Sequence, residues 1–384
     1  MASRLYRTTR PLYLAVEQVL WQLQVPLVGS PTLAALIALS VTGLILLSAR
    51  PTQTRVARHL PGRAHDALNR SLRTLPWSTR VLMRLLGGFA QRLGRDGYLV
   101  LDEVIVEKAF AKRLSWAAKV YSFKDKRTVY GMVLVVLVWC SCDGQWRIPV
   151  GFRLWRPKRS CRATRYQTKL ELACPLVTAV VQAGVPVGYI VFDTHYTAGW
   201  FTKRLARLKL TWQGTLDPKT IVVWRGKRMA VRDLASTLHL SWRSHLGVRA
   251  MALRIYAPKY GQLRLVVTKN RHGNFEYLVS NDLHSDLTSM VVRKRSRWSV
   301  ETVFRDSKQF AELEACQCWV DQAMVRHVAL VLLTFVVLQL LRHSPDEPVG
   351  TVKERWQVAV IRDGEQPPPP LRACPVELRA RATA

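Results

Sequence analysis

The chain has 384 residues, 49% of them hydrophobic, which is enough for one large domain or two to three ordinary ones with a substantial core. This excludes a small disulfide-rich protein and a disordered chain. Lys and Arg number 58 against 26 Asp and Glu, so the formal net charge is +32, and we expect a polyanionic partner, nucleic acid before an anionic membrane surface. Seven cysteines without CxxC spacing predict reduced thiols and no zinc knuckle.

The N-terminal part contains a long apolar stretch. Residues 18–49 carry no charge, and residues 31–49 approach the roughly 20 apolar residues that a membrane-spanning helix needs. Polar residues interrupt the run, however, and arginines flank it on both sides, so no charge asymmetry would orient an insertion. We therefore predict a buried helix of a soluble domain, with a membrane-tethered basic protein as an alternative. A second apolar run, residues 329–341, is too short to span a membrane and predicts a core helix.

The next segment predicts two short basic helices around a turn. Residues 52–60 and 64–75 alternate Arg and His with apolar residues at helical spacing, on either side of Pro61 and Gly62. This pattern suits a helix-turn-helix that binds DNA. The alternative is a plain helical hairpin with a solvated basic face.

From Gly97 the pattern changes to short runs rich in Val and Ile. A turn at Cys142-Asp143-Gly144 predicts that the second and third runs form a hairpin. The predicted order is strands 98–106, 129–139 and 146–154, helix 166–183, strand 187–192, helix 198–208 and strand 209–212. This β-β-β-α-β-α-β order is typical of a ribonuclease-H-like core. Alternating segments after residue 212 predict a mostly β insertion.

Two aspartates come at the predicted ends of the first and fourth strands. Asp102 and Asp193 would repel and raise each other's pKa unless cations lay between them. Carboxylate oxygens favour Mg²⁺ or Mn²⁺, and two such ions roughly 4 Å apart can support phosphodiester transfer. Glu103 should point to the opposite face of its strand.

A third carboxylate comes from a helix that begins near Trp298. Arg297, Glu301, Arg305 and Lys308 are spaced so that all four lie on one helix face. One acid among three bases can hold a metal ion and bind the surrounding phosphates. An exposed helix with ordinary ion pairs would explain this window by itself, but less well together with the two strand-end aspartates.

At these residues the chain resembles the DDE transposases of bacterial insertion sequences, in the group with a β insertion and a Y-(2)-R-(3)-E-(6)-K signature. Arg297, Glu301 and Lys308 have this spacing, whereas Lys294 takes the tyrosine position. The resemblance also covers Leu101-Asp102-Glu103-Val104, where the family often has Asp-x-Thr, and the segment that begins at Asp193. It extends over about residues 52–342.

The resemblance implies a transposase that cleaves transposon ends and joins the 3′ hydroxyl to target DNA. Asp102, Asp193 and Glu301 would hold two Mg²⁺ or Mn²⁺ ions per active site. The implied partners are double-stranded DNA, as terminal inverted repeats and target, and a second copy of the chain in a homodimer on DNA. No membrane is implied, and the location would be the bacterial cytoplasm at the nucleoid. A catalytically inactive DNA-binding relative remains the alternative, with Lys294 and Val104 as signs of decay.

Basic residues are the predicted DNA contacts. A segment without acids, residues 153–169, interleaves seven basic residues with Trp155 and Tyr166 and should bind phosphates in a salt-dependent way. The expected contacts are Lys294, Arg297, Arg305, Lys308, Arg156, Lys158, Arg159 and Arg162. The predicted domains are an N-terminal helical DNA-binding domain (1–95), the core in two parts (96–212 and 291–343), the β-rich insertion (213–290) and a flexible tail (344–384).

Overall fold

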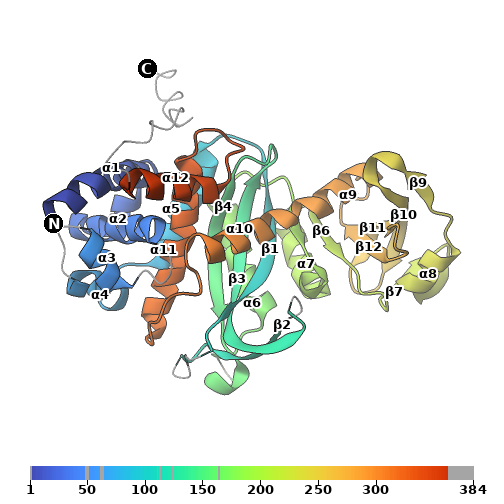
Figure 1. Ribbon diagram of the computed structural model, residues 1–384. Helices are drawn as coiled ribbons and strands as arrows, with labels where there is room; N and C mark the ends of the chain where they lie inside the picture. Colours follow the sequence, from blue (N-terminus) through green and yellow to red (C-terminus); the bar gives the residue numbers. More distant parts are fainter. Residues whose placement is uncertain are drawn as a thin grey trace.

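The computed structural model describes residues 2–47, 52–60, 65–109, 111, 114–122, 125–162 and 165–361. These residues form a mixed α/β fold with helices at the N-terminal end and one large mixed sheet, consistent with a ribonuclease-H-like core (Figure 1). The sheet has 12 strands in the described residues. Its central strands are β1 (Gly97–Glu107), β3 (Arg127–Ser141), β4 (Arg147–Trp155), β5 (Ile190–Phe192) and β6 (Trp212–Thr215).

The central strands lie in the order β4-β3-β1-β5-β6. β3 is antiparallel to both β1 and β4, and β5 is parallel to β1 and β6. The predicted hairpin is present, because Gly144 with φ +72° makes the turn between β3 and β4. The sequence missed β2 (Ala118–Ser122), a short strand with exposed polar residues that pairs with the start of β3.

Helices cover the central strands. They are α5 (Thr79–Arg92), α6 (Lys169–Gln182) and α7 (Gly199–Arg207). α5 packs on β4, and α6 packs on β3 and β4. Thr168 and Glu171 form a capping box that fixes the start of α6, since each side chain accepts a hydrogen bond from the other's backbone N–H.

The β-rich segment continues the central sheet. It contains β7 (Ile221–Trp224), β8 (Lys227–Ala230), α8 (Val231–Thr237), β9 (Ser241–Arg243), β10 (Val248–Ala257), β11 (Gly261–Lys269) and β12 (Phe275–Ser280). β12 pairs with β6, so this lobe extends the sheet at its edge. Helices α9 (Leu287–Ser296) and α10 (Trp298–Gln309) then lead back from the lobe to β1 (Figure 1).

The N-terminal helices form a bundle with the C-terminal ones. The bundle contains α1 (Ala2–Gln22), α2 (Pro31–Leu46), α3 (Gln53–His59), α4 (His65–Arg73), α11 (Asp321–Leu340) and α12 (Val349–Ile361), at the left in Figure 1. The apolar stretch 31–46 is the buried helix that the sequence predicted, with Ser30 as its N-cap, and it contacts α1, α11 and α12.

Helix α11 is longer than its apolar run predicted. Within the described part of the chain it is the one helix that could cross a membrane by length and composition, but 89% of its most apolar window is buried in the protein. It begins at Asp321 and includes Arg326, whose guanidinium donates to backbone carbonyls of Ser71, Leu72, Leu75 and Trp77. Because these carbonyls satisfy the buried charge, the helix can start before its apolar residues do.

The predicted tail was wrong over residues 349–361, which form α12. Val352 and Trp356 are buried, and the Lys353 Nζ donates to carbonyls of Leu44 and Phe310. Pro348 directly precedes this helix, a position where proline is compatible with a helix start. Residues 362–384 lie outside the described residues.

Candidate active site

The two predicted aspartates lie side by side on neighbouring strands. β1 and β5 pair in parallel, with Leu101 opposite Phe192; Asp102 is the next residue of β1, and Asp193 is the first residue after β5. The sequence placed Asp102 at the end of its strand, but it lies in the middle of β1. It follows the last residue of β1 that pairs with β5, so the aspartate is where the parallel pairing ends.

Asp102 is buried beside a positive and a negative charge. Its side chain accepts hydrogen bonds from the Glu103 backbone N–H (2.8 Å) and from the Arg297 guanidinium (2.5 Å). The pKa of Asp102 is raised from 3.8 to about 7, first by burial; Arg297 opposes this increase in pKa, and Asp193 adds to it. Burial thus favours the neutral form of this carboxyl, and a further cation beside it would favour the charged form.

The backbone of a short turn fixes Asp193. Its Oδ1 accepts from the N–H groups of His195 (2.9 Å) and Tyr196 (3.3 Å), at the start of the 3₁₀ turn Thr194–Tyr196. The Thr197 hydroxyl donates to the Asp193 carbonyl (3.0 Å). These contacts hold the carboxylate close to the strand end.

Arg297 brings the third carboxylate to this place. It lies between α9 and α10, and its guanidinium donates to both Asp102 (2.5 Å) and Glu301 (2.8 Å). In the described residues no group of three or more His, Cys, Asp or Glu side chains is close enough to hold a metal ion. The structure thus gathers Asp102 and Glu301 around one guanidinium, whose charge takes the place that a cation would otherwise fill.

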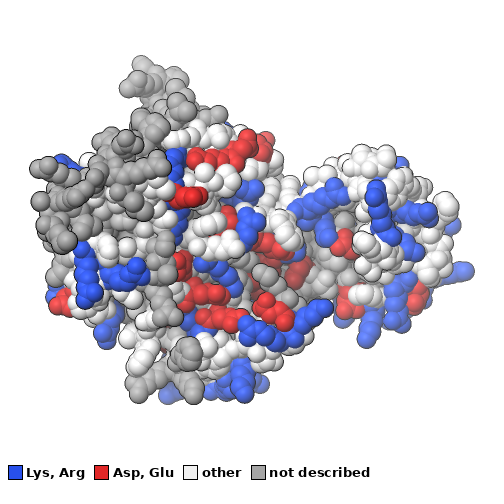
Figure 2. Space-filling view, viewed as in Figure 1, with Lys and Arg blue, Asp and Glu red and all other residues white. Residues whose placement is uncertain are grey.

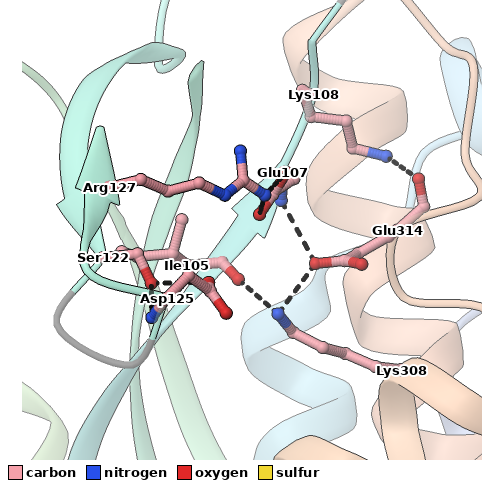
Figure 3. Close-up of polar contacts among 8 residues, drawn as sticks. All are labelled: Ile105, Glu107, Lys108, Ser122, Asp125, Arg127, Lys308 and Glu314. Atoms are coloured by element: carbon pink, nitrogen blue, oxygen red, sulfur yellow. Dashed lines mark hydrogen bonds and ion pairs between the residues drawn. The ribbon is translucent and has the colours of Figure 1, made fainter. Parts of the chain in front are cut away.

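The sequence predicted that three bases surround Glu301. In the described residues, Arg297 is the one of the three whose contact with Glu301 is present. Lys308 instead donates to the Ile105 carbonyl (2.8 Å) and forms an ion pair with Glu314 (2.7 Å), as Figure 3 shows. Glu314 also accepts from the Glu107 backbone N–H (3.2 Å). Lys308 therefore fastens the end of α10 to β1.

Arg305 also lies in a different contact from the one expected. It donates to Asp306 (2.9 Å), its neighbour in the chain, and its side chain is 57% exposed.

Glu314 was missed by the sequence because it lies in an irregular segment without periodicity.

A cavity of about 220 Å³ adjoins the aspartates on the side of the β-rich lobe. Asp193, Glu276, Lys294 and Arg297 are among its lining residues. Lys294, the residue at the tyrosine position, forms an ion pair with Glu276 of β12 (2.5 Å). Acidic and basic side chains therefore alternate along the cavity from the aspartates to the β-rich lobe. Glu276 is an acidic lining residue that the sequence did not single out.

The basic segment 153–169 is only partly available to a partner. Lys158, Arg159 and Arg162 are exposed. Arg156 lies near Asp321 (3.5 Å) and over the Trp116 ring, and it remains 44% exposed. Lys169 forms an ion pair with Glu103 (2.5 Å), which also accepts from the Tyr196 hydroxyl. Figure 2 shows acidic side chains gathered over β1 and α10, between basic side chains on the β-rich lobe and on the lower edge.

The residues present fit a hard divalent cation. Asp102, Asp193 and Glu301 offer only oxygen atoms, the donors that Mg²⁺ and Mn²⁺ prefer. Burial and the neighbouring Asp193 raise the pKa of Asp102, and a cation bound there would offset both effects. Ligation by all three requires Arg297 to leave its position between Asp102 and Glu301.

Comparison with known families shows the family of the chain. A family model described as DDE superfamily endonuclease matches residues 26–236, more than half of the chain, and the chain therefore belongs to this family. Membership implies an endonuclease that acts on DNA, in a family that generally uses divalent metal ions. The matched region includes Asp102 and Asp193, whereas Glu301 lies beyond it. A search of curated proteins gives no match to the chain.

Proposed function

We propose that the protein is a DNA transposase that cleaves transposon ends and joins the freed 3′ hydroxyl to target DNA. Asp102, Asp193 and Glu301 would hold two Mg²⁺ or Mn²⁺ ions. The observation that carries the proposal is the pair of aspartates on adjacent parallel strands, with Glu301 linked to Asp102 through Arg297. In such a site the ions activate the attacking oxygen and stabilise the leaving one.

The side chains of the protein have distinct parts in this reaction. Asp193 is held in place by backbone N–H groups, and Asp102 loses its proton more readily when positive charge is added beside it. Arg297 has a planar guanidinium that can bind a phosphate through two hydrogen bonds once the carboxylates are otherwise neutralised. Its release would couple completion of the site to the arrival of DNA.

The DNA would contact both sides of this site. We assign phosphate contacts to Lys294 and Arg297 at the cavity and to Arg305 and Lys308 on α10, the last two after release from Asp306 and Glu314. The exposed segment supplies Arg156, Lys158, Arg159 and Arg162. We further propose a homodimer on DNA, since two transposon ends must be joined, and a location in the bacterial cytoplasm at the nucleoid.

One observation favours a second candidate, a DNA-binding relative without cleavage activity. Arg297 occupies the space between Asp102 and Glu301, and Lys294 is bound to Glu276. If DNA did not displace these contacts, the protein would bind DNA without assembling a metal site.

The deciding experiment is cleavage of a DNA fragment that contains the coding region and its native flanks, with Mg²⁺ or Mn²⁺. The wild type is compared with Glu301→Gln, and with Glu354→Gln as a control because Glu354 is exposed on α12, away from the site. We expect cuts at the element ends from the wild type and the control, and none from Glu301→Gln or in the presence of a chelator. Salt-sensitive binding by all three proteins without cuts would support the inactive relative instead.

A further inference from the structure

A second cavity lies on the other side of α10, between the helical bundle and the segment that joins α10 to α11. Its volume is about 230 Å³. Its lining includes Thr52 at the start of α3, His65 and Asn69 of α4, and Cys316, Cys318 and His327. The cavity brings two thiols, two residues apart in the sequence, to one surface that the proposed reaction does not use.

The two thiols form a hydrogen-bonded pair of unequal acidity. The hydrogen bond from Cys316 lowers the pKa of Cys318 to about 7; burial opposes this, and Arg73 and Lys108 reinforce it. The same hydrogen bond and burial raise the pKa of Cys316. At neutral pH Cys318 is therefore the nucleophile, and Cys316 retains its proton.

This pair differs from other cysteines of the described chain. Cys140 is buried, and burial raises its pKa to about 12. Cys142 is exposed, but its pKa is also raised, first by burial and then by Asp96 and Asp143. Access, a neighbouring thiol and nearby positive charges come together at Cys316 and Cys318.

We propose that Cys316 and Cys318 form a thiol–disulfide exchange site that a low-molecular-weight disulfide oxidises to an intramolecular disulfide. The Cys318 thiolate attacks one sulfur of the small disulfide, forms a mixed disulfide and releases one thiolate, which takes up a proton. Cys316 then loses its proton and attacks the Cys318 sulfur, which releases the second small thiol. The protein loses two protons and two electrons, and the small disulfide gains both.

The position of the pair links its redox state to the neighbouring segment. The Lys108 Nζ donates to the carbonyls of Cys316 (2.8 Å) and Glu314 (2.7 Å). The Glu314 carboxylate in turn binds Lys308 and the Glu107 backbone N–H, as Figure 3 shows. Closing a disulfide around residue 317 changes the backbone between Glu314 and Cys318, and so loosens the contacts that hold α10 on β1. The formation of the disulfide does not depend on the proposed function. Only an effect of this oxidation on DNA cleavage would rest on it.

The test exposes the full-length protein to oxidised glutathione and identifies the products by mass spectrometry of peptides after alkylation. We expect the wild type to lose two hydrogens at Cys316 and Cys318, with a rate that is half-maximal near pH 7 and a reversal by dithiothreitol. Cys316→Ser should stop at a mixed disulfide on Cys318. Cys318→Ser should slow the reaction of Cys316 at least tenfold, and Cys142→Ser, the control, should react like the wild type.

Hydrogen exchange of the backbone provides an independent measurement. Oxidation should speed exchange of the Glu107 N–H, which donates to Glu314, and leave Val133 in the centre of β3 unchanged. The proposal is overturned if Cys318 reacts no faster than Cys142 at pH 7, or if the wild type stops at a mixed disulfide. Unchanged exchange at Glu107 in the oxidised protein would contradict the link to β1. None of these outcomes depends on transposase activity.

Discussion

At the scale of single residues, the main feature of the candidate site is the raised pKa of Asp102, which sets its protonation state. Its side chain is 12% exposed, and its pKa is raised from 3.8 to about 7, first by burial. The folded state therefore binds a proton more tightly than the unfolded state does between pH 4 and 7. The stability from this group is complete below pH 4 and is lost as the pH rises to about 7.

We predict that Asp102→Asn removes this pH dependence. Relative to the wild type, the variant should gain stability as the pH rises from 4 to 7, by about 1.4 kcal/mol for each unit of raised pKa. Urea unfolding at several pH values, followed by tryptophan fluorescence in a chelator, measures the difference. Asp282→Asn is a control with the opposite pH dependence. Because a hydrogen bond from Ser285 lowers the pKa of Asp282, this variant should lose stability relative to the wild type as the pH rises. Parallel curves for Asp102→Asn and the wild type would refute the assignment.

Lys308 provides a second prediction at this scale. The sequence predicts that Lys308→Ala weakens DNA cleavage and leaves the fold intact, but Lys308 also binds Ile105 and Glu314. We therefore expect the free energy of unfolding of the variant to be about 1–3 kcal/mol lower, because the Ile105 carbonyl loses a charged donor and Glu314 loses its ion pair. Gln309→Ala, at an exposed position of the same helix, should change the unfolding free energy by less than about 0.5 kcal/mol. Equal unfolding midpoints for the two variants would show that Lys308 does not fasten α10.

At the scale of elements, the site depends on how closely β6 approaches the turn after β5. Gly214 of β6 allows this approach, since an added Cβ would lie 2.8 Å from the Phe192 ring and closer still to the Thr197 hydroxyl. Thr197 itself binds the Asp193 carbonyl. A strand without a glycine here would push the turn that fixes Asp193 away from the sheet.

We predict that Gly214→Ala lowers the free energy of unfolding by about 1–3 kcal/mol through overpacking. It should also reduce metal-dependent cleavage, because Asp193 moves with the turn. The same substitution at Gly88, inside α5, meets only the Arg92 guanidinium at 3.4 Å and should stabilise the protein by up to about 1 kcal/mol. Thermal unfolding of both variants tests the pair, and a destabilised Gly88→Ala or an unaffected Gly214→Ala would contradict the packing argument.

At the scale of the whole molecule, acidic and basic side chains lie in different regions around the candidate site. Acidic side chains gather over β1 and α10, and basic side chains lie on the β-rich lobe and in the exposed segment (Figure 2). Binding of a polyanion across this face would neutralise many charges of a chain whose net charge is +32. The affinity for DNA should therefore depend strongly on salt.

We predict that the triple variant Lys158→Ala, Arg159→Ala, Arg162→Ala binds duplex DNA with a smaller salt dependence. The slope of the logarithm of affinity against the logarithm of salt concentration should fall by about 0.9 for each lost phosphate contact. Titration of labelled duplex DNA at four salt concentrations gives this slope. A slope equal to that of the wild type would exclude this segment from the DNA interface.

Much of the arrangement follows from the sequence alone. Short runs rich in Val and Ile predicted β1, β3 and β4, because branched side chains favour strands, and the segment Cys142-Asp143-Gly144 predicted the turn. The apolar stretch 31–49 predicted a buried helix, which the structure has over Pro31–Leu46, and the spacing of Arg297 and Glu301 predicted their contact on one helix face. These features depend on local periodicity, which the sequence carries directly.

Only the tertiary structure decided which charges meet. Arg297 binds Asp102 across 195 positions of sequence, and Lys308 turns toward Ile105 and Glu314. The strand β2 has only five residues and is stabilised by pairing with β3. The helix α12 has apolar residues at helical spacing, but its place in the fold comes from packing on the distant helices α1 and α2. Pairing across the chain depends on which strands lie next to each other, and no local spacing encodes that choice. For this reason the sequence determined which residues are candidates for the site, whereas the fold determined that a guanidinium lies between two of their carboxylates.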